Sequence, residues 1–205
     1  MEHQKQQILV QAESLFLRYG IKSVTMDDLA RELGVSKKTL YQYIENKADL
    51  ISQIILNHVE EETDCINSIC DQTLNAVEQM LVIGKYVVQQ LGKISPTVVY
   101  DLKKYYRQSW ELMEMLHRQH VYQVIVKNIE KGIKEGLYRE NLNTDVIAKL
   151  YVGKTFLLVD EDIFPLKNYE KEHLFREFIF YHLFGIVSQK GLKTLEKLIP
   201  RYLTT

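Results

Sequence analysis

Apolar residues recur at helical spacing along nearly the whole chain of 205 residues. In the first segment they form one stripe, which consists of Ile8, Leu9, Ala12, Leu15, Phe16 and Tyr19. This spacing follows the period of 3.6 residues of an α-helix, and Gly20 is placed to end that helix. No run of alternating polar and apolar residues is long enough to predict a strand. The chain is therefore expected to be all-α.

Polar capping signals divide the remainder of the chain into further helices. Thr25, Ser36 and Asn46 each stand directly before a helical pattern, and Gly34 interrupts the pattern between the first two. The capping signals and the helical pattern together predict helices at 26–33, 37–44, 47–70, 73–92, 96–106, 108–135, 144–160, 170–189 and 192–203. About ten helices with short connections are expected.

The composition fits this picture. The chain has only 9 Gly and 3 Pro, so few turns are expected, and 46% hydrophobic residues supply a buried core for one large or two small domains. No stretch reaches the roughly 18–20 apolar residues of a membrane span. The N-terminus lacks the basic-then-apolar order of a signal peptide. A cytoplasmic protein without a membrane partner is expected.

Two short helices joined by a glycine-containing turn have the outline of a helix-turn-helix. Burial of Leu40 and Ile44 would leave the second helix presenting hydrogen-bonding and cationic side chains. Ser36–Lys47 carries a charge of +2, although the whole chain carries −1. Such a helix can enter the major groove of DNA. A short solvated helix in a bundle that binds no DNA remains the alternative at this point.

The same stretch resembles the DNA-binding domain of the tetracycline-repressor (TetR) family. The segments that carry the resemblance are V-T-M-D-D-L-A-R-E-L-G-V-S and K-K-T-L-Y-Q-Y-I-E-N-K-A-D-L, within roughly residues 5–55. Ile44 departs from the family's usual Phe but keeps an apolar side chain. The resemblance implies a helix-turn-helix DNA-binding domain at 1–46 and a helical effector-binding and dimerisation domain at 47–205.

The resemblance assigns two sets of candidate DNA contacts. Those expected in or near the groove are Lys37, Lys38, Thr39, Tyr41 and Gln42. Those expected at phosphates are Thr25, Ser36, Tyr43 and Lys47. Asp27 can either accept a hydrogen bond from a cytosine amino group or favour the positive end of its own helix.

The helices at 144–160 and 170–189 are apolar on nearly every face. One small core cannot cover all these faces, so a second buried face is expected, and a two-fold homodimer interface provides one. The candidate interface residues are Tyr151, Phe178, Tyr181, Phe184 and Gly185. Two central core helices of a monomer are the alternative.

The family plan also implies an effector pocket in the C-terminal domain. The candidate lining residues are Tyr86, Tyr105, Tyr106, Trp110, Met113, Tyr122 and Phe156. Aromatic side chains at helical spacing are nevertheless more often core residues than pocket walls.

The sequence contains none of the usual catalytic motifs, and neither cofactor nor metal is expected. His117 and His120 share one helix face, but we expect them to be surface residues rather than a metal site. We expect Cys65 and Cys70 to be small apolar residues of the packing rather than redox-sensing thiols.

The expected function is a dimeric transcriptional regulator, most simply a repressor that a small-molecule effector releases from a palindromic DNA operator. The alternatives are an activator, a DNA-binding regulator without an effector, and a small helical enzyme. The sequence leaves open the operator, the regulated genes and the effector.

Overall fold

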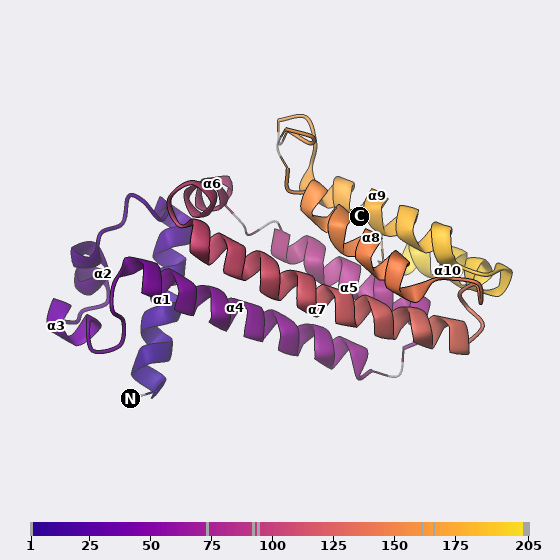
Figure 1. The fold of residues 1–205 in the computed structure, drawn as a ribbon, viewed down its shortest axis with the longest axis horizontal. Coiled ribbons are helices and arrows are strands. Elements are labelled where there is room, and N and C mark those ends of the chain that lie inside the picture. The colour runs from indigo at the N-terminus through magenta and orange to yellow at the C-terminus, as the bar shows by residue number, and fades with distance from the viewer. Residues whose placement is uncertain are drawn as a thin grey trace. The chain divides into compact units, whose positions relative to one another are not determined.

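The computed structural model describes residues 2–72, 74–91, 93, 95–160, 162–165 and 167–202. Within these residues the chain forms ten α-helices and no strand, which confirms the all-α class (Figure 1). The helices are α1 (Glu2–Tyr19), α2 (Met26–Glu32), α3 (Lys37–Leu40), α4 (Lys47–Cys70), α5 (Ala76–Leu91), α6 (Pro96–Tyr105), α7 (Arg107–Lys134), α8 (Thr144–Leu157), α9 (Lys171–Ile186) and α10 (Gln189–Tyr202).

Most helices begin and end within a few residues of their predicted limits, but α3 is shorter than expected. It ends at Leu40 instead of near Ile44 because Gln42 and Tyr43 donate their backbone N–H groups three residues back, to Thr39 and Leu40. These are turn bonds rather than α-helical bonds. The predicted helix ends at 73, 92 and 203 lie outside the described residues.

The chain divides into two compact units, and the boundary falls within α4 and α7. The first unit consists of Met1–Thr63 and Ile94–His117, and the second of Asp64–Lys93 and Arg118–Thr205. The division follows packing rather than function, so a DNA-binding domain at 1–46 remains a prediction. None of the described helices combines the length and the apolar character that crossing a membrane requires.

The core of the first unit holds the two short helices against α1 and α4. The apolar stripe of α1 is buried at Ile8, Leu9, Ala12 and Phe16. Leu29 of α2 and Leu40 of α3 are fully buried in the same cluster. α2 and α3 lie next to each other (Figure 1), so the apolar side chains fix the geometry of the pair.

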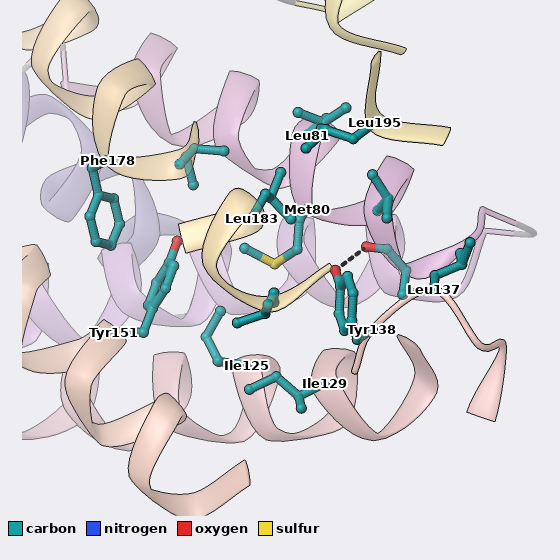
Figure 2. Packing of buried hydrophobic residues seen from close by; sticks show 14 of the residues in the cluster. Met80, Leu81, Ile125, Ile129, Leu137, Tyr138, Tyr151, Phe178, Leu183 and Leu195 are labelled. Carbon is teal, nitrogen blue, oxygen red and sulfur yellow. Dashed lines mark hydrogen bonds between the residues drawn. The ribbon is translucent and has the colours of Figure 1, made fainter. Parts of the chain in front are cut away.

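The core of the second unit is a layer of aliphatic and aromatic side chains from α5 and from α7 to α10, part of which Figure 2 shows. Tyr138 is the largest of the fully buried side chains there, and its hydroxyl lies 2.9 Å from Asn128 Oδ1 and 3.1 Å from the carbonyl of Ala76. Burial raises the pKa of Tyr138 well above its usual value, so the hydroxyl remains protonated. A buried polar network therefore joins α5 to α7.

Candidate nucleic-acid interface

Side-chain caps on both short helices set the turn between α2 and α3. The Thr25 hydroxyl accepts a hydrogen bond from the N–H of Asp28 at 3.1 Å, and the Asp28 carboxylate accepts from the N–H of Thr25 at 3.0 Å. This reciprocal pair is a capping box. Gly34 has a φ of +64°, which a residue with a side chain rarely adopts, and the Ser36 hydroxyl accepts from Thr39 N–H. The predicted caps are confirmed.

The residues after Ser36 present a polar surface. Lys37, Lys38, Tyr41 and Gln42 are exposed, whereas Leu40 is fully buried. The buried leucine anchors the short helix, so the side chains around it point outward. This arrangement offers ammonium, hydroxyl and amide groups in the combination that contacts base edges and phosphates.

Asp27 of α2 forms an ion pair with Lys37 of α3, with Oδ1 and Nζ 2.8 Å apart. The hydrogen bond to Asp27 raises the pKa of the Lys37 ammonium. Both side chains are well exposed, so the pair contributes little to stability. The two roles predicted for Asp27 do not include this contact. Lys37 lies ten residues later in the chain, on another helix, so the ion pair depends on how α2 and α3 pack together.

Three of the residues expected at phosphates also make hydrogen bonds within the chain. The Thr25 and Ser36 hydroxyls serve as helix caps, and the Tyr43 hydroxyl donates to Gln4 Oε1 of α1 at 2.8 Å. These bonds orient the hydroxyl groups. Each oxygen retains a lone pair or proton for a further partner.

Lys47 differs from the expectation of a free phosphate clamp. Its ammonium donates to the backbone carbonyls of Ile21 and Val24, and it lies 5.8 Å from the ring centre of Phe16. Burial lowers the pKa of this ammonium. Lys47 therefore ties the start of α4 to the loop before α2, because these carbonyls precede a helix and need a donor.

The structure distributes the seven predicted effector contacts between the two units. Tyr106, Trp110 and Met113 pack against the core of the first unit, where Tyr105 is exposed. Tyr105 and Tyr106 border a cavity of about 520 Å³ beside the start of α4. The members in the second unit are Tyr86, Tyr122 and Phe156.

A cavity of about 620 Å³ in the second unit is lined by none of the seven residues. Its wall is mostly polar and consists of Asn67, Cys70, Asp71, Gln79, His120, Gln123, Val124, Lys127 and Lys131. Five of these residues come from α7 at offsets of 0, 3, 4, 7 and 11 from His120, which is one face of a helix. This stripe lies within the helix predicted at 108–135, but the predicted lining residues were mostly aromatic and did not include it.

Two of the five residues predicted at the dimer interface lie in the core instead. Tyr151 and Phe178 are buried, with ring centres 4.7 Å apart, and Figure 2 shows them side by side. Their helices bury one face within the chain and leave another outside, and the apolar pattern alone did not assign these residues to a face.

The other three predicted interface residues are exposed on α9. Tyr181 is 67% exposed and Phe184 51%, and a Cβ at Gly185 would meet no atom within 4 Å. On α8 a matching exposed stripe recurs at spacings of four, three and four residues, which the interface prediction did not include: Val146, Leu150, Gly153 and Leu157. Together these seven residues form an exposed apolar surface, called the α8–α9 face below.

A helix-turn-helix on a bundle of helices, with polar groups presented by its second helix, defines the class of DNA-binding regulators. Residues 8–54 match the tetR family of bacterial regulatory proteins. Residues 8–54 therefore carry the DNA-binding domain of this family, and the chain is a DNA-binding transcriptional regulator. This assignment removes the small helical enzyme from the alternatives.

Two relatives that align with three quarters or more of this chain are also HTH-type transcriptional regulators. The HTH-type transcriptional regulator YvaF of Bacillus subtilis is 28% identical over 165 residues, which are 78% of this chain and 83% of YvaF. The HTH-type transcriptional repressor KstR2 of Mycobacterium tuberculosis is 21% identical over 75% of this chain and 78% of its own.

Two solved structures share the fold. A transcriptional regulator from Cytophaga hutchinsonii superposes with a TM-score of 0.76 and 16% identity, over 89% of this chain and 98% of its own. A regulator from Saccharomonospora viridis in complex with choline superposes with a TM-score of 0.64 and 18% identity. The match covers 92% of this chain and 100% of that regulator.

Proposed function

We propose that the protein is a homodimeric, cytoplasmic repressor that a small molecule releases from its operator. The observation that carries the dimer is the α8–α9 face. Its large apolar side chains are exposed in the single chain, and Gly153 and Gly185 leave room for a partner's backbone. Exposed apolar side chains together with exposed glycines on two helices are suited to helix packing between two copies.

DNA binding within this proposal uses the helix-turn-helix of each subunit. Base contacts come from the exposed Lys37, Lys38, Tyr41 and Gln42 and the half-buried Thr39, and phosphate contacts from Thr25, Ser36 and Tyr43. Lys47 acts indirectly, by holding the loop before α2. A two-fold dimer recognises a palindrome whose half-sites are centred about 34–36 Å apart, or a multiple of that.

The effector in this proposal occupies the cavity of the second unit. Two lysines, one aspartate and several amides line it, which favours a polar ligand over a purely apolar one. KstR2 is a repressor and the Saccharomonospora viridis regulator was crystallised with choline, so regulators with this fold include a repressor and a protein that binds a small molecule. The ligand shifts DNA binding only by its different affinity for the two conformations.

The test begins with selection of bound duplexes from random-sequence DNA. A palindromic consensus protected symmetrically in a footprint is expected, together with a dimer in sedimentation velocity. A reporter placed behind that sequence should be silenced when the protein is expressed. A non-palindromic consensus would contradict the dimeric mode, and reporter activation would make the protein an activator.

The effector site is tested with a cavity-filling variant. Gln123 lies on the cavity wall and its side chain is exposed, so Gln123→Trp should fill space there without changing operator affinity. Polar metabolites that dissociate the wild-type complex should lose this effect on the variant. Unchanged release by such a ligand would place the effector elsewhere, and release by no compound would favour a regulator without an effector.

A further inference from the structure

A basic and aromatic surface occurs on the first unit outside the helix-turn-helix. It is formed by Lys22, Tyr100, Lys103, Lys104 and Tyr105, and is called the tyrosine–lysine surface here. All five side chains are exposed, although Tyr is a residue that usually buries most of its ring. Lys22 belongs to the loop before α2, and the other four belong to α6.

The members of this surface hold one another in place. The Lys22 ammonium donates to the Tyr105 hydroxyl at 3.0 Å and lies 4.3 Å from the centre of its ring. The Lys104 ammonium donates to the Tyr100 hydroxyl and lies 5.5 Å from the centre of the Tyr105 ring. The two tyrosine rings meet edge to face, 6.4 Å apart. Cation–π contacts of this kind position the ammonium groups and leave their charge in place.

The positive charge of the surface has no exposed carboxylate on α6 to balance it. The acidic residue in the α6 sequence is Asp101, which is buried and accepts the backbone N–H of Lys22 at 2.8 Å. The hydrogen bond to Tyr105 raises the pKa of the Lys22 ammonium, which remains charged at neutral pH. Three ammonium groups and two hydroxyl groups therefore face solvent in a chain whose net charge is −1.

The position of this surface connects it to the DNA-binding elements. Lys22 precedes Thr25, the cap of α2, by three residues, and its backbone is bound to Asp101 of α6. The surface therefore continues from the start of α2, where a phosphate contact is proposed, onto α6 of the same compact unit.

We propose that the tyrosine–lysine surface is a second DNA contact, which binds the phosphate backbone beside the segment read by α3. Lysine ammonium and tyrosine hydroxyl groups both contact phosphate oxygens, and such contacts increase affinity without reading sequence. The surface lengthens the stretch of DNA that each subunit covers. It also supplies positive charge that α3, with Lys37 paired to Asp27, provides only in part.

The test is the salt dependence of binding to a duplex recovered by selection. Replacing both lysines of α6, in Lys103→Gln/Lys104→Gln, should reduce the slope of log K against log salt by about 1.8 for each bound subunit, because each phosphate contact contributes about 0.9. Affinity at 0.1 M salt should fall roughly 10- to 100-fold for each bound subunit. The selected consensus should stay the same, since no base contact is lost.

A matched control carries the same change of charge in the second unit. Lys193 and Lys197 are exposed on α10, so Lys193→Gln/Lys197→Gln should leave the slope near the wild-type value. Lys104→Arg should also retain the slope because it keeps the charge. If the α6 double variant loses its helical circular dichroism, Lys104→Gln alone replaces it, with an expected decrease in slope of about 0.9 for each bound subunit.

A wild-type slope in a folded α6 variant would overturn the proposal. The surface would then fit an acidic protein segment better than DNA. An altered base consensus would also overturn it, because a phosphate contact carries no sequence preference.

Discussion

At the scale of single residues, hydrogen-bond partners separate groups that look alike in the sequence. Lys38 and Lys47 are both lysines of the predicted DNA-binding region, yet Lys38 is exposed whereas the Lys47 ammonium is bound to two backbone carbonyls. The sequence predicted the caps Thr25 and Ser36 because a cap is a local property. It could not predict the acceptors of Lys47, which lie more than twenty residues away.

We predict that Lys47→Met lowers stability and leaves the salt dependence of DNA binding unchanged. The substitution removes the donor for two carbonyls at the start of α2, which should cost about 1–3 kcal/mol in the free energy of unfolding. Denaturant titration and binding at several salt concentrations measure the two effects. Lys38→Met is the control, and it should reduce the salt slope by about 0.9 for each bound subunit without loss of stability. If Lys47→Met instead reduces the salt slope and leaves stability unchanged, Lys47 contacts a DNA phosphate.

A second residue prediction concerns His182, which is buried beside Tyr151 with ring centres 4.7 Å apart. Burial, with a smaller contribution from Lys154, lowers its pKa to about 4. An unfolded histidine has a pKa of about 6.5, so between these values the unfolded state binds the proton more readily. Stability should therefore fall as pH drops, by about 3 kcal/mol from pH 7 to pH 4.

The variant His182→Phe should lack this part of the pH dependence. Free energies of unfolding measured at pH 7, 6 and 5 for both proteins give the difference. Parallel curves would mean that His182 takes up a proton as readily in the folded state as in the unfolded state, in disagreement with its buried site.

At the scale of elements, close contacts between backbone atoms decide how α10 packs against the rest of the second unit. α10 begins two residues after Val187, whose backbone pairs with that of Tyr138. A Cβ at Gly191 would lie 1.9 Å from the carbonyl oxygen of Leu137. Since that oxygen is backbone, it cannot rotate away. The sequence predicted a helix in this region, whereas the need for glycine at this position comes from the tertiary contact.

We predict that Gly191→Ala destabilises the second unit, although alanine favours helix formation. Overpacking of this kind costs about 1–3 kcal/mol, which exceeds the gain of up to about 1 kcal/mol in helix propensity. Chemical denaturation monitored by circular dichroism measures the change. Lys193→Ala, at an exposed position of the same helix, should shift stability by less than about 0.5 kcal/mol. An unchanged Gly191→Ala protein would show that α10 moves without cost.

At the scale of the whole molecule, the α8–α9 face links fold to function. The sequences of α8 and α9 contain more apolar residues than one core can cover, so a second buried face was predicted. Which residues belong to it depended on packing, because Tyr151 and Phe178 turn inward whereas Tyr181 and Phe184 turn outward on helices of similar composition.

We predict that Tyr181→Asp/Phe184→Asp yields a folded monomer with weak operator binding. Two charges would have to be desolvated in the apolar interface, so association should be lost. Because a monomer binds each half-site separately, operator affinity should fall roughly 100-fold or more. Sedimentation velocity and fluorescence anisotropy measure these effects. Met115→Asp is a control at an exposed apolar residue of α7 and should remain dimeric. A variant that stays dimeric would place the interface elsewhere.

The sequence by itself determined the helical class, the limits of most helices and the helix-turn-helix, because helical period, caps and turn glycines act over a few residues. Only the tertiary structure decided the inward position of Lys47, the polar cavity wall, and the division of α8 and α9 into a buried and an exposed face. These features depend on contacts between residues far apart in the chain. A pattern along one helix states that a face is apolar, but packing decides what covers it.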